Sequence, residues 1–268
     1  MPPSIGLGKT MNIKMIFHRI FFHKARYVIA LVLLFLPSVE LLLQIKRVIE
    51  GAEIYKPEMA AFLSLSTVGN GHVLQIIYIW FMPLYLLVLF SENILEDNKL
   101  HYKACFLVRG KKDNYYVMHT LKSFLGGFVL IFGGLGLNWL SSVILFHGGK
   151  GTLGTFFAKD DLANWMNTHQ IMTYFIYLLL FALFGGLISA VGSAFSVVLK
   201  DRKIVYGLTL LIWLVPLTMR PSLAILFQPF CEYSILDCKV VGGISLAIYM
   251  FFIIAGGIYE KKNQSKMD

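Results

Sequence analysis

Residues 171–199 read IMTYFIYLLLFALFGGLISAVGSAFSVVL and contain no charged side chain. A helix needs about 20 mostly apolar residues to cross the hydrocarbon core of a bilayer, and this stretch is long enough. The whole chain of 268 residues is 57% hydrophobic and 15% charged, with a mean hydropathy of +0.69. Because a soluble domain usually has about 45 to 50% apolar and about 25% charged residues, this composition predicts an integral membrane protein.

Five further apolar runs accompany this one, and none alternates apolar and polar residues as the strands of a membrane β-barrel do. The sequence therefore predicts an all-α membrane protein with six transmembrane helices. The predicted spans are residues 27–45, 74–94, 124–146, 171–199, 204–219 and 240–259. The fifth run is short for a full crossing, and Pro216 is expected to bend it.

The distribution of basic residues predicts the orientation of the chain. Cytoplasmic loops of membrane proteins carry an excess of Lys and Arg. With the N-terminus in the cytoplasm, 17 of the 24 Lys and Arg residues fall in cytoplasmic segments and the other 7 in outer segments. Both termini are therefore predicted to be cytoplasmic. No cleavable signal peptide is expected ahead of the first span.

Two segments outside the spans have distinctive patterns. Residues 13–26 place apolar side chains on one helical face and most basic side chains off it, which predicts an amphipathic interfacial helix. A simple basic anchor for the first span remains open. Residues 220–239 are too polar and too rich in proline for a span, so they predict a re-entrant outer segment. Cys231 and Cys238 fall there, where a disulfide bond and two buried thiols are both open.

Small residues on the third and fourth spans predict close helix packing. Glycine and alanine recurring on one face of a helix let neighbouring backbones approach, which is how helices associate in lipid. The candidate packing residues are Gly126, Gly133, Gly134, Gly186 and Ala190. Asn138, in the third span, is expected to form an interhelical hydrogen bond, and a role contacting substrate remains open.

Glu40 is the one acidic residue inside the first predicted span. A carboxylate at this depth is a candidate functional group. It lies close in sequence to Lys46 and Arg47, so a structural role at the outer interface remains open as well.

Motifs for chemistry are absent from the sequence. The stretch IGLGKT has Pro3 where a phosphate-binding loop needs its first glycine. The seven histidines form no H-E-x-x-H motif, and no G-x-S-x-G elbow occurs. We therefore expect no catalytic residue and no metal site. The positive charge is explained by topology, so no nucleic-acid partner is expected.

Charges of both signs gather between the second and third spans, whereas topology alone would need only the cations. They include Glu92, Glu96, Asp97, Lys99, Arg109 and Asp113. The mixture, followed by Gly110 and Tyr115, predicts a short inner helix, a turn and a second helix that enters the third span. Such a segment, residues 92–113, is suited to dock in a groove of a soluble partner. An ordinary solvated loop remains open.

Together these features resemble the permease subunits of the ABC type-2 exporter superfamily, which are bacterial exporters of drugs, peptides and lipids. The resemblance rests on the basic amphipathic helix, six spans with both ends inside, the charged coupling segment and the outer re-entrant segment. Its most local part is an acidic residue ending the second span, then a turn, a basic residue, a tyrosine and a lysine. In this sequence these are Glu92, Gly110, Arg109, Tyr115 or Tyr116, and Lys122.

The resemblance implies a non-catalytic permease in the bacterial cytoplasmic membrane, with no cofactor of its own. ATP and Mg would bind a separate ABC ATPase subunit, contacted through the coupling segment and Tyr115. A second permease copy or a sister permease would complete a dimer in the membrane lipid. Apolar spans favour a hydrophobic or amphipathic cargo such as an antimicrobial peptide, a lipid or a drug. The alternatives are an ion-coupled secondary transporter or channel, and an intramembrane enzyme.

Overall fold

In a computed structural model of the chain, residues 24–51, 73–100, 114–147, 165, 166, 168–199, 201–229 and 234–264 are described. All regular structure within these ranges is helical, and no strand occurs in them. The α-helices are α2 (Lys24–Ile49), α3 (Val73–Leu86), α4 (Glu92–Lys99), α6 (Asn114–Leu145), α8 (Gln170–Val198), α9 (Arg202–Thr218) and α10 (Ile235–Gln264). A π-helical turn, η1 (Leu87–Ser91), joins α3 to α4, and a 3₁₀ helix, η3 (Leu223–Phe227), follows α9.

Within the described ranges, five helices are long and apolar enough to cross a membrane. They are Lys24–Leu43, Leu74–Lys99, Tyr115–Leu145, Gln170–Val198 and Ile235–Asn263. The second of these joins α3, η1 and α4 into one rod. The described part of the chain is therefore all-helical, and the protein is a multi-pass membrane protein. The predicted fifth span, residues 204–219, overlaps α9, which has 17 residues and is not one of these five helices.

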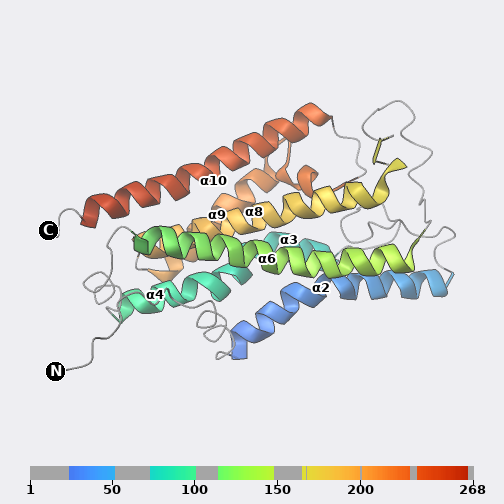
Figure 1. The fold of residues 1–268 in the computed structure, drawn as a ribbon, viewed down its shortest axis with the longest axis horizontal. Helices are drawn as coiled ribbons and strands as arrows, with labels where there is room; N and C mark the ends of the chain where they lie inside the picture. The colour runs from blue at the N-terminus through green and yellow to red at the C-terminus, as the bar shows by residue number, and fades with distance from the viewer. Residues whose placement is uncertain are drawn as a thin grey trace, which may run out of the picture.

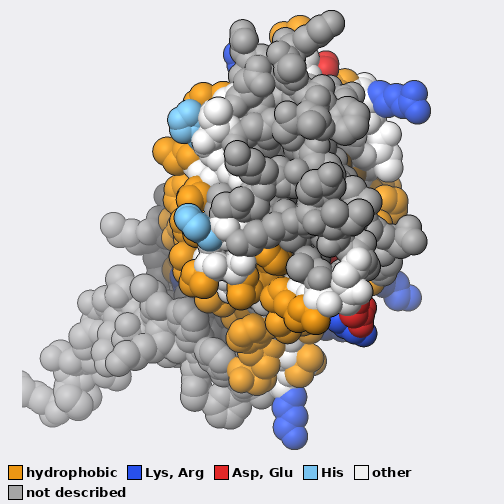
Figure 2. Space-filling model, turned by 90° about the vertical axis from the view of Figure 1, so that its right-hand side faces the viewer, with side chains coloured by type: hydrophobic (Ala, Val, Ile, Leu, Met, Phe, Trp, Pro, Cys, Tyr) orange, Lys and Arg blue, Asp and Glu red, His pale blue; other side chains and the backbone are white. Residues whose placement is uncertain are grey.

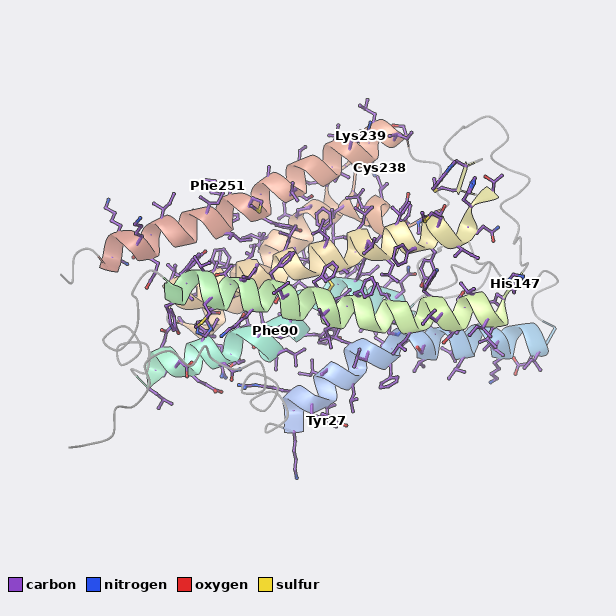
Figure 3. All side chains as sticks on the ribbon, viewed as in Figure 1. Tyr27, Phe90, His147, Cys238, Lys239 and Phe251 are labelled. Carbon is purple, nitrogen blue, oxygen red and sulfur yellow. The ribbon has the colours of Figure 1, made fainter. Side chains whose placement is uncertain are left out.

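The long helices run in alternating directions along one axis, which is horizontal in Figure 1, with α3 and α4 as parts of one rod. The start of α2 and the end of α10 consequently lie toward the same end of the bundle. α8 is the central helix, since 67% of its most apolar stretch is buried, against 17% for the peripheral α10. Phe251 shows the difference, because it lies on α10 with 65% of its surface exposed (Figure 3).

The helices around the predicted coupling segment are longer than their apolar runs. The rod that was expected to end at residue 94 continues to Lys99, and α6 begins at Asn114 rather than at residue 124. No glycine or proline lies between Pro83 and Gly110, so nothing in the backbone stops the helix where charge begins. The expected interfacial helix, residues 13–26, lies outside the described residues except for its last three, which belong to α2.

Pro37 frees a backbone carbonyl inside the bundle, and a neighbouring helix satisfies it. Proline has no N–H, so the carbonyl of Leu33, one turn earlier in α2, lacks its helical donor. The hydroxyl of Tyr78 on α3 donates to this oxygen at 3.4 Å. Tyr78 is fully buried. The proline thus creates a polar contact that holds α3 against α2.

Pro83 in α3 also frees a backbone carbonyl, and a side chain of α9 satisfies it. It frees the carbonyl of Ile79 in α3, and the indole Nε1 of Trp213 on α9 donates to that oxygen at 2.8 Å. Trp213 is also fully buried. Because an unsatisfied polar group in the hydrocarbon region costs several kcal/mol, these contacts specify which helices are neighbours.

Small residues mark the closest helix contacts. Gly134 in α6 lies against the backbone of α2 at Leu33 and Leu34, so an added Cβ would collide with it. A Cβ on Gly186 in α8 would lie 2.9 Å from the carbonyl oxygen of Phe124 in α6. Gly126 faces the ring of Phe90 from η1. Gly133 makes an ordinary contact with α2, and Ala190 is buried in α8.

The 3₁₀ helix η3, which follows α9, is buried within the protein. Phe227 of η3 packs edge-on against Phe181 at a ring separation of 4.5 Å and stacks with Trp213 at 5.9 Å. These contacts hold η3 against α8 and α9. Within the predicted re-entrant segment, Cys238 lies in the first turn of α10 as a free thiol, and Cys231 lies outside the described residues.

Replacing Gly134 with leucine should force α6 away from α2 and lower the thermal unfolding midpoint. Overpacking of this kind costs about 1 to 3 kcal/mol. The matched control is Gly136→Leu on the same helix, because nothing lies within 4 Å of a Cβ at that position. The midpoint can be measured by fluorescence-detected size exclusion after heating. Equal midpoints for the two variants would contradict the packing described.

Trp213→Phe should destabilise the protein by about 1 kcal/mol, because the carbonyl of Ile79 loses its donor. The loss should shrink when Pro83→Ala is also present, since an alanine at this position supplies the missing helical N–H. The double-mutant cycle measures this coupling in detergent or lipid. Strictly additive effects would show that the indole does not compensate for Pro83.

Candidate functional site

Four helix ends meet at one end of the bundle, here named the charged end. It is formed by α4, the starts of α2 and α9, and the end of α8 (Figure 1). Its polar residues are Arg26, Glu92, Asn93, Glu96, Asn98, Arg202 and Tyr206. The contacts among them join α4 to the other three helices.

Glu92, the first residue of α4, ties this helix to α9. The residue is 7% exposed. Its carboxylate accepts hydrogen bonds from the Arg202 guanidinium and from the Tyr206 hydroxyl, the latter at 2.6 Å. The partner guanidinium is half-exposed, so the pair sits where the bundle meets solvent. A carboxylate with two donors is well accommodated at such a boundary.

Arg26 ties α4 to α2. It lies in the first turn of α2 and is 4% exposed. Because arginine is rarely buried without partners, its contacts are informative. Its guanidinium donates to the side-chain oxygen of Asn93 and, at 3.1 Å, to Oε1 of Glu96. The fork of donors on arginine allows both contacts from one side chain.

Asn98 ties α4 to the end of α8. Its side-chain amide donates to the carbonyl of Ser196 at 2.7 Å. Ser196 lies in the last turn of α8, where the final carbonyl groups have no helical donor. The contact therefore caps α8 while fixing the far end of α4.

The start of α6 joins α10 at the same end. The hydroxyl of Tyr116 donates to the carbonyl of Ile253 in α10. Gly256 and Gly257 permit this approach, since a Cβ on Gly256 would lie 2.8 Å from the Tyr116 oxygen. Tyr115 is buried beside Ile94 of α4.

The π-helical turn η1 sets the direction in which α4 presents its charges. A π turn holds one residue more than an α turn, so it rotates everything after it by about 100° relative to a regular helix. The side chain of Leu87 in this turn packs against Gly192 of α8. Glu92 follows immediately, and its orientation toward α9 depends on this extra residue. Such wide turns are frequent at functional sites.

The structure separates the residues predicted for coupling into three groups. Glu92, Asp97 and Tyr115 are buried among helices, Glu96 is partly exposed and paired with Arg26, and Lys99 is exposed. Arg109, Gly110 and Asp113 lie outside the described residues. Within the described ranges, no group of three or more His, Cys, Asp and Glu is placed to hold a metal ion.

The sequence prediction missed the partners of Glu92 and Glu96. Arg26 was counted as a topology signal and as the end of the amphipathic segment 13–26, Arg202 was counted as a topology signal, and Tyr206 was not singled out. They lie 70, 110 and 114 residues from the carboxylates that they contact. No local pattern in one sequence relates residues so far apart. Their positions at the starts of two helices were the one available indication.

Comparison with known proteins gives one long match. Over 248 residues, the chain is 29% identical to "Uncharacterized protein YybM" of Bacillus subtilis (strain 168), covering 91% of this chain and 96% of that protein. The similarity thus extends along nearly the whole of both proteins, and the description of the relative states no activity. The chain matches no known family profile and no solved structure.

Reversing the charge of Arg202 should destabilise the charged end, because Arg202→Glu places two carboxylates together. We expect a loss of about 1 kcal/mol, which the second change Glu92→Arg should partly restore. Lys203→Glu is the control, since it makes the same charge change on the next, exposed residue. Thermal midpoints of the four proteins test this. Equal losses for Arg202→Glu and Lys203→Glu would contradict a specific pair.

Proposed function

We propose that the chain is the membrane-spanning subunit of an ATP-driven ABC exporter. It would move a hydrophobic or amphipathic cargo, such as an antimicrobial peptide, a lipid or a drug, with energy from a separate ATPase subunit. The observation that carries this proposal is the attachment of α4 to three helices at once, through Glu92, Arg26 and Asn98. A segment held in this way passes any force on it to the whole bundle.

The distribution of basic residues supports a cytoplasmic location for the charged end. The described basic residues near this end are Lys24, Arg26, Lys99, Lys122, Arg202, Lys203, Lys261 and Lys262. Near the opposite end they are Lys46, Arg47, Arg220 and Lys239. An excess of Lys and Arg on one side is typical of the cytoplasmic side. Seen from the opposite end, the exposed side chains of the described residues are largely hydrophobic (Figure 2).

The proposed topology has six crossings, with α9 as the fifth. A helix of 17 residues is about 26 Å long, somewhat less than the hydrocarbon core of about 30 Å. The buried 3₁₀ helix η3 follows directly and would fill the remaining depth. Both termini would then be cytoplasmic, in a bacterial cytoplasmic membrane.

In the proposed mechanism, the segment from Glu92 to Asp113 sits in a cleft of the ATPase. Nucleotide binding closes the ATPase subunits and displaces this segment. Because α4 is fastened to α2, α8 and α9, its displacement tilts these helices and changes access to the cargo path. The two nucleotide states would make different contacts with α4, as any ligand-driven switch requires.

A second permease, either an identical copy or a sister chain, would complete the path. The exposed apolar faces of α6 and α10 are available to such a partner or to lipid. Leu125 and Val129 belong to the first of these faces, and Phe251 and Ile258 to the second.

The deciding experiment is to purify the chain in mild detergent from the cells that produce it and to identify its companions by mass spectrometry. The proposal predicts a stoichiometric ATPase and ATP hydrolysis by the purified material. If the chain is isolated alone and is inert toward ATP, the proposal fails. Flux driven by an ion gradient through the lone protein in liposomes would then favour a secondary transporter.

Arg109→Glu should uncouple ATP hydrolysis from export while the complex still assembles, because this residue belongs to the proposed docking segment. Lys46→Glu makes the same charge change at the opposite end of the bundle and should leave coupling intact. Coupling is measured as the ratio of cargo exported to ATP hydrolysed by reconstituted complexes. Normal export by Arg109→Glu would show that residues 92–113 do not transmit the motion.

A further inference from the structure

A second polar region lies inside the bundle, near the end opposite the charged end. Glu40 of α2 is only 1% exposed. Lys46, farther along the same helix, is exposed and pairs with Glu50 at 3.6 Å. Glu40 therefore does not reach the surface as Lys46 does, and it lies about 9 Å deeper along the helix axis.

Ser142 of α6 lies level with Glu40. α2 and α6 run in the same direction (Figure 1), and the amide of Asn138 on α6 donates to the carbonyl of Pro37 on α2 at 2.8 Å. Glu40 lies three residues after Pro37, and Ser142 lies four residues after Asn138. Both are therefore one turn beyond this contact, and both are buried.

Gln75 of α3 approaches the same level from a third helix. Tyr78, which contacts Leu33 of α2, lies one turn away from Gln75 on the same face of α3. Side chains of a helix lean toward its N-terminus, and α3 begins at the end where Glu40 lies. Gln75 is 1% exposed, and neither atom of its amide has a hydrogen-bond partner among the described residues. A buried amide without a partner is a place where a water molecule or an ion can bind.

The region below these three side chains is closed by hydrogen bonds. The hydroxyl of Tyr174 on α8 donates to Asn138 at 2.5 Å, and Asn138 in turn donates to Pro37. The side chains of Tyr174 and Asn138 are fully buried. Glu40, Gln75 and Ser142, here named the outer polar layer, thus lie just outside a sealed contact between α2, α6 and α8.

We propose that the outer polar layer binds a monovalent cation, either a proton or an alkali metal ion, at the carboxylate of Glu40. A carboxylate buried inside membrane-spanning helices marks an ion or proton site. Carboxylate, amide and hydroxyl oxygens together form a set of hard ligands suited to such a cation. This site does not depend on the proposed ATPase partner.

Several other titratable groups lie near the outer polar layer and bear on its response to pH. Tyr78 approaches from α3 and Tyr174 from α8. His147 lies at the end of α6, beside the far part of α2 (Figure 3). Lys46 and Glu50 lie farther along α2 itself. Substitution of Glu40 separates its contribution from theirs.

The test measures thermal unfolding of the purified protein in lipid nanodiscs. Midpoints are compared between pH 5 and pH 8, and with NaCl, KCl or N-methylglucamine chloride at equal ionic strength. A cation at about ten times its Kd should raise the midpoint by about 3 to 6 °C. Glu40→Gln should abolish this dependence, whereas the exposed control Glu50→Gln should retain it.

Each outcome decides the proposal. A rise with acid alone identifies the cation as a proton, and a rise with Na⁺ or K⁺ but not N-methylglucamine identifies it as an alkali metal ion. If the wild-type protein responds to neither, or if Glu40→Gln responds as the wild type does, the proposal is wrong.

A second measurement covers the case in which Glu40→Gln does not fold. Dicyclohexylcarbodiimide modifies carboxyl groups that are protonated in apolar surroundings, and mass spectrometry locates the adduct. On the wild-type protein in alkali-free buffer, modification of Glu40 should decline as the pH rises or as an alkali ion is added. Glu40 unmodified at every pH, or modified equally under all conditions, would overturn the site.

Discussion

Backbone carbonyl groups inside a membrane bundle have no water to bind, and two prolines of this chain release such groups. The carbonyl of Leu33 is satisfied by Tyr78 and that of Ile79 by Trp213. Each contact joins a helix to the next through a buried aromatic side chain. Trp213 in turn stacks on Phe227, which fastens the 3₁₀ helix to the same core. The arrangement of α2, α3, α9 and η3 follows from satisfying these two oxygens.

The length of the apolar runs was sufficient to predict most of the helices, but not where they end. The predicted span 171–199 and α8 differ by one residue at each end, because charge and polarity appear in the sequence where that helix finishes. The second span fails this rule. Its helix continues through Glu92 and Asp97, since neighbouring helices bury these side chains. A hydropathy profile contains no information about such neighbours. The charged residues shortened the predicted span, whereas the helix itself continues because no proline or glycine interrupts it.

The two polar regions show what a single sequence conveys about a site. Asn138 was predicted to bond between helices, and its contact with Pro37 confirms that prediction, because an amide in a span has few other uses. Glu92 stood out as the charge that ends an apolar run, but its partner Arg202 is 110 residues away. Gln75 was not singled out, since one amide near the start of a span is ordinary until its burial is known.

The wide turn at Leu87–Ser91 also has a consequence for comparing this chain with its relatives. A protein with the same bundle but a regular α-helix there would need one residue fewer between Pro83 and the acidic residue that faces α9. An ungapped alignment from Pro83 onward would then pair that acidic residue with Ser91 rather than with Glu92. A single-residue gap in this stretch would therefore be a structural event, the gain or loss of one helical register, and the residues after it should be compared by the face they occupy.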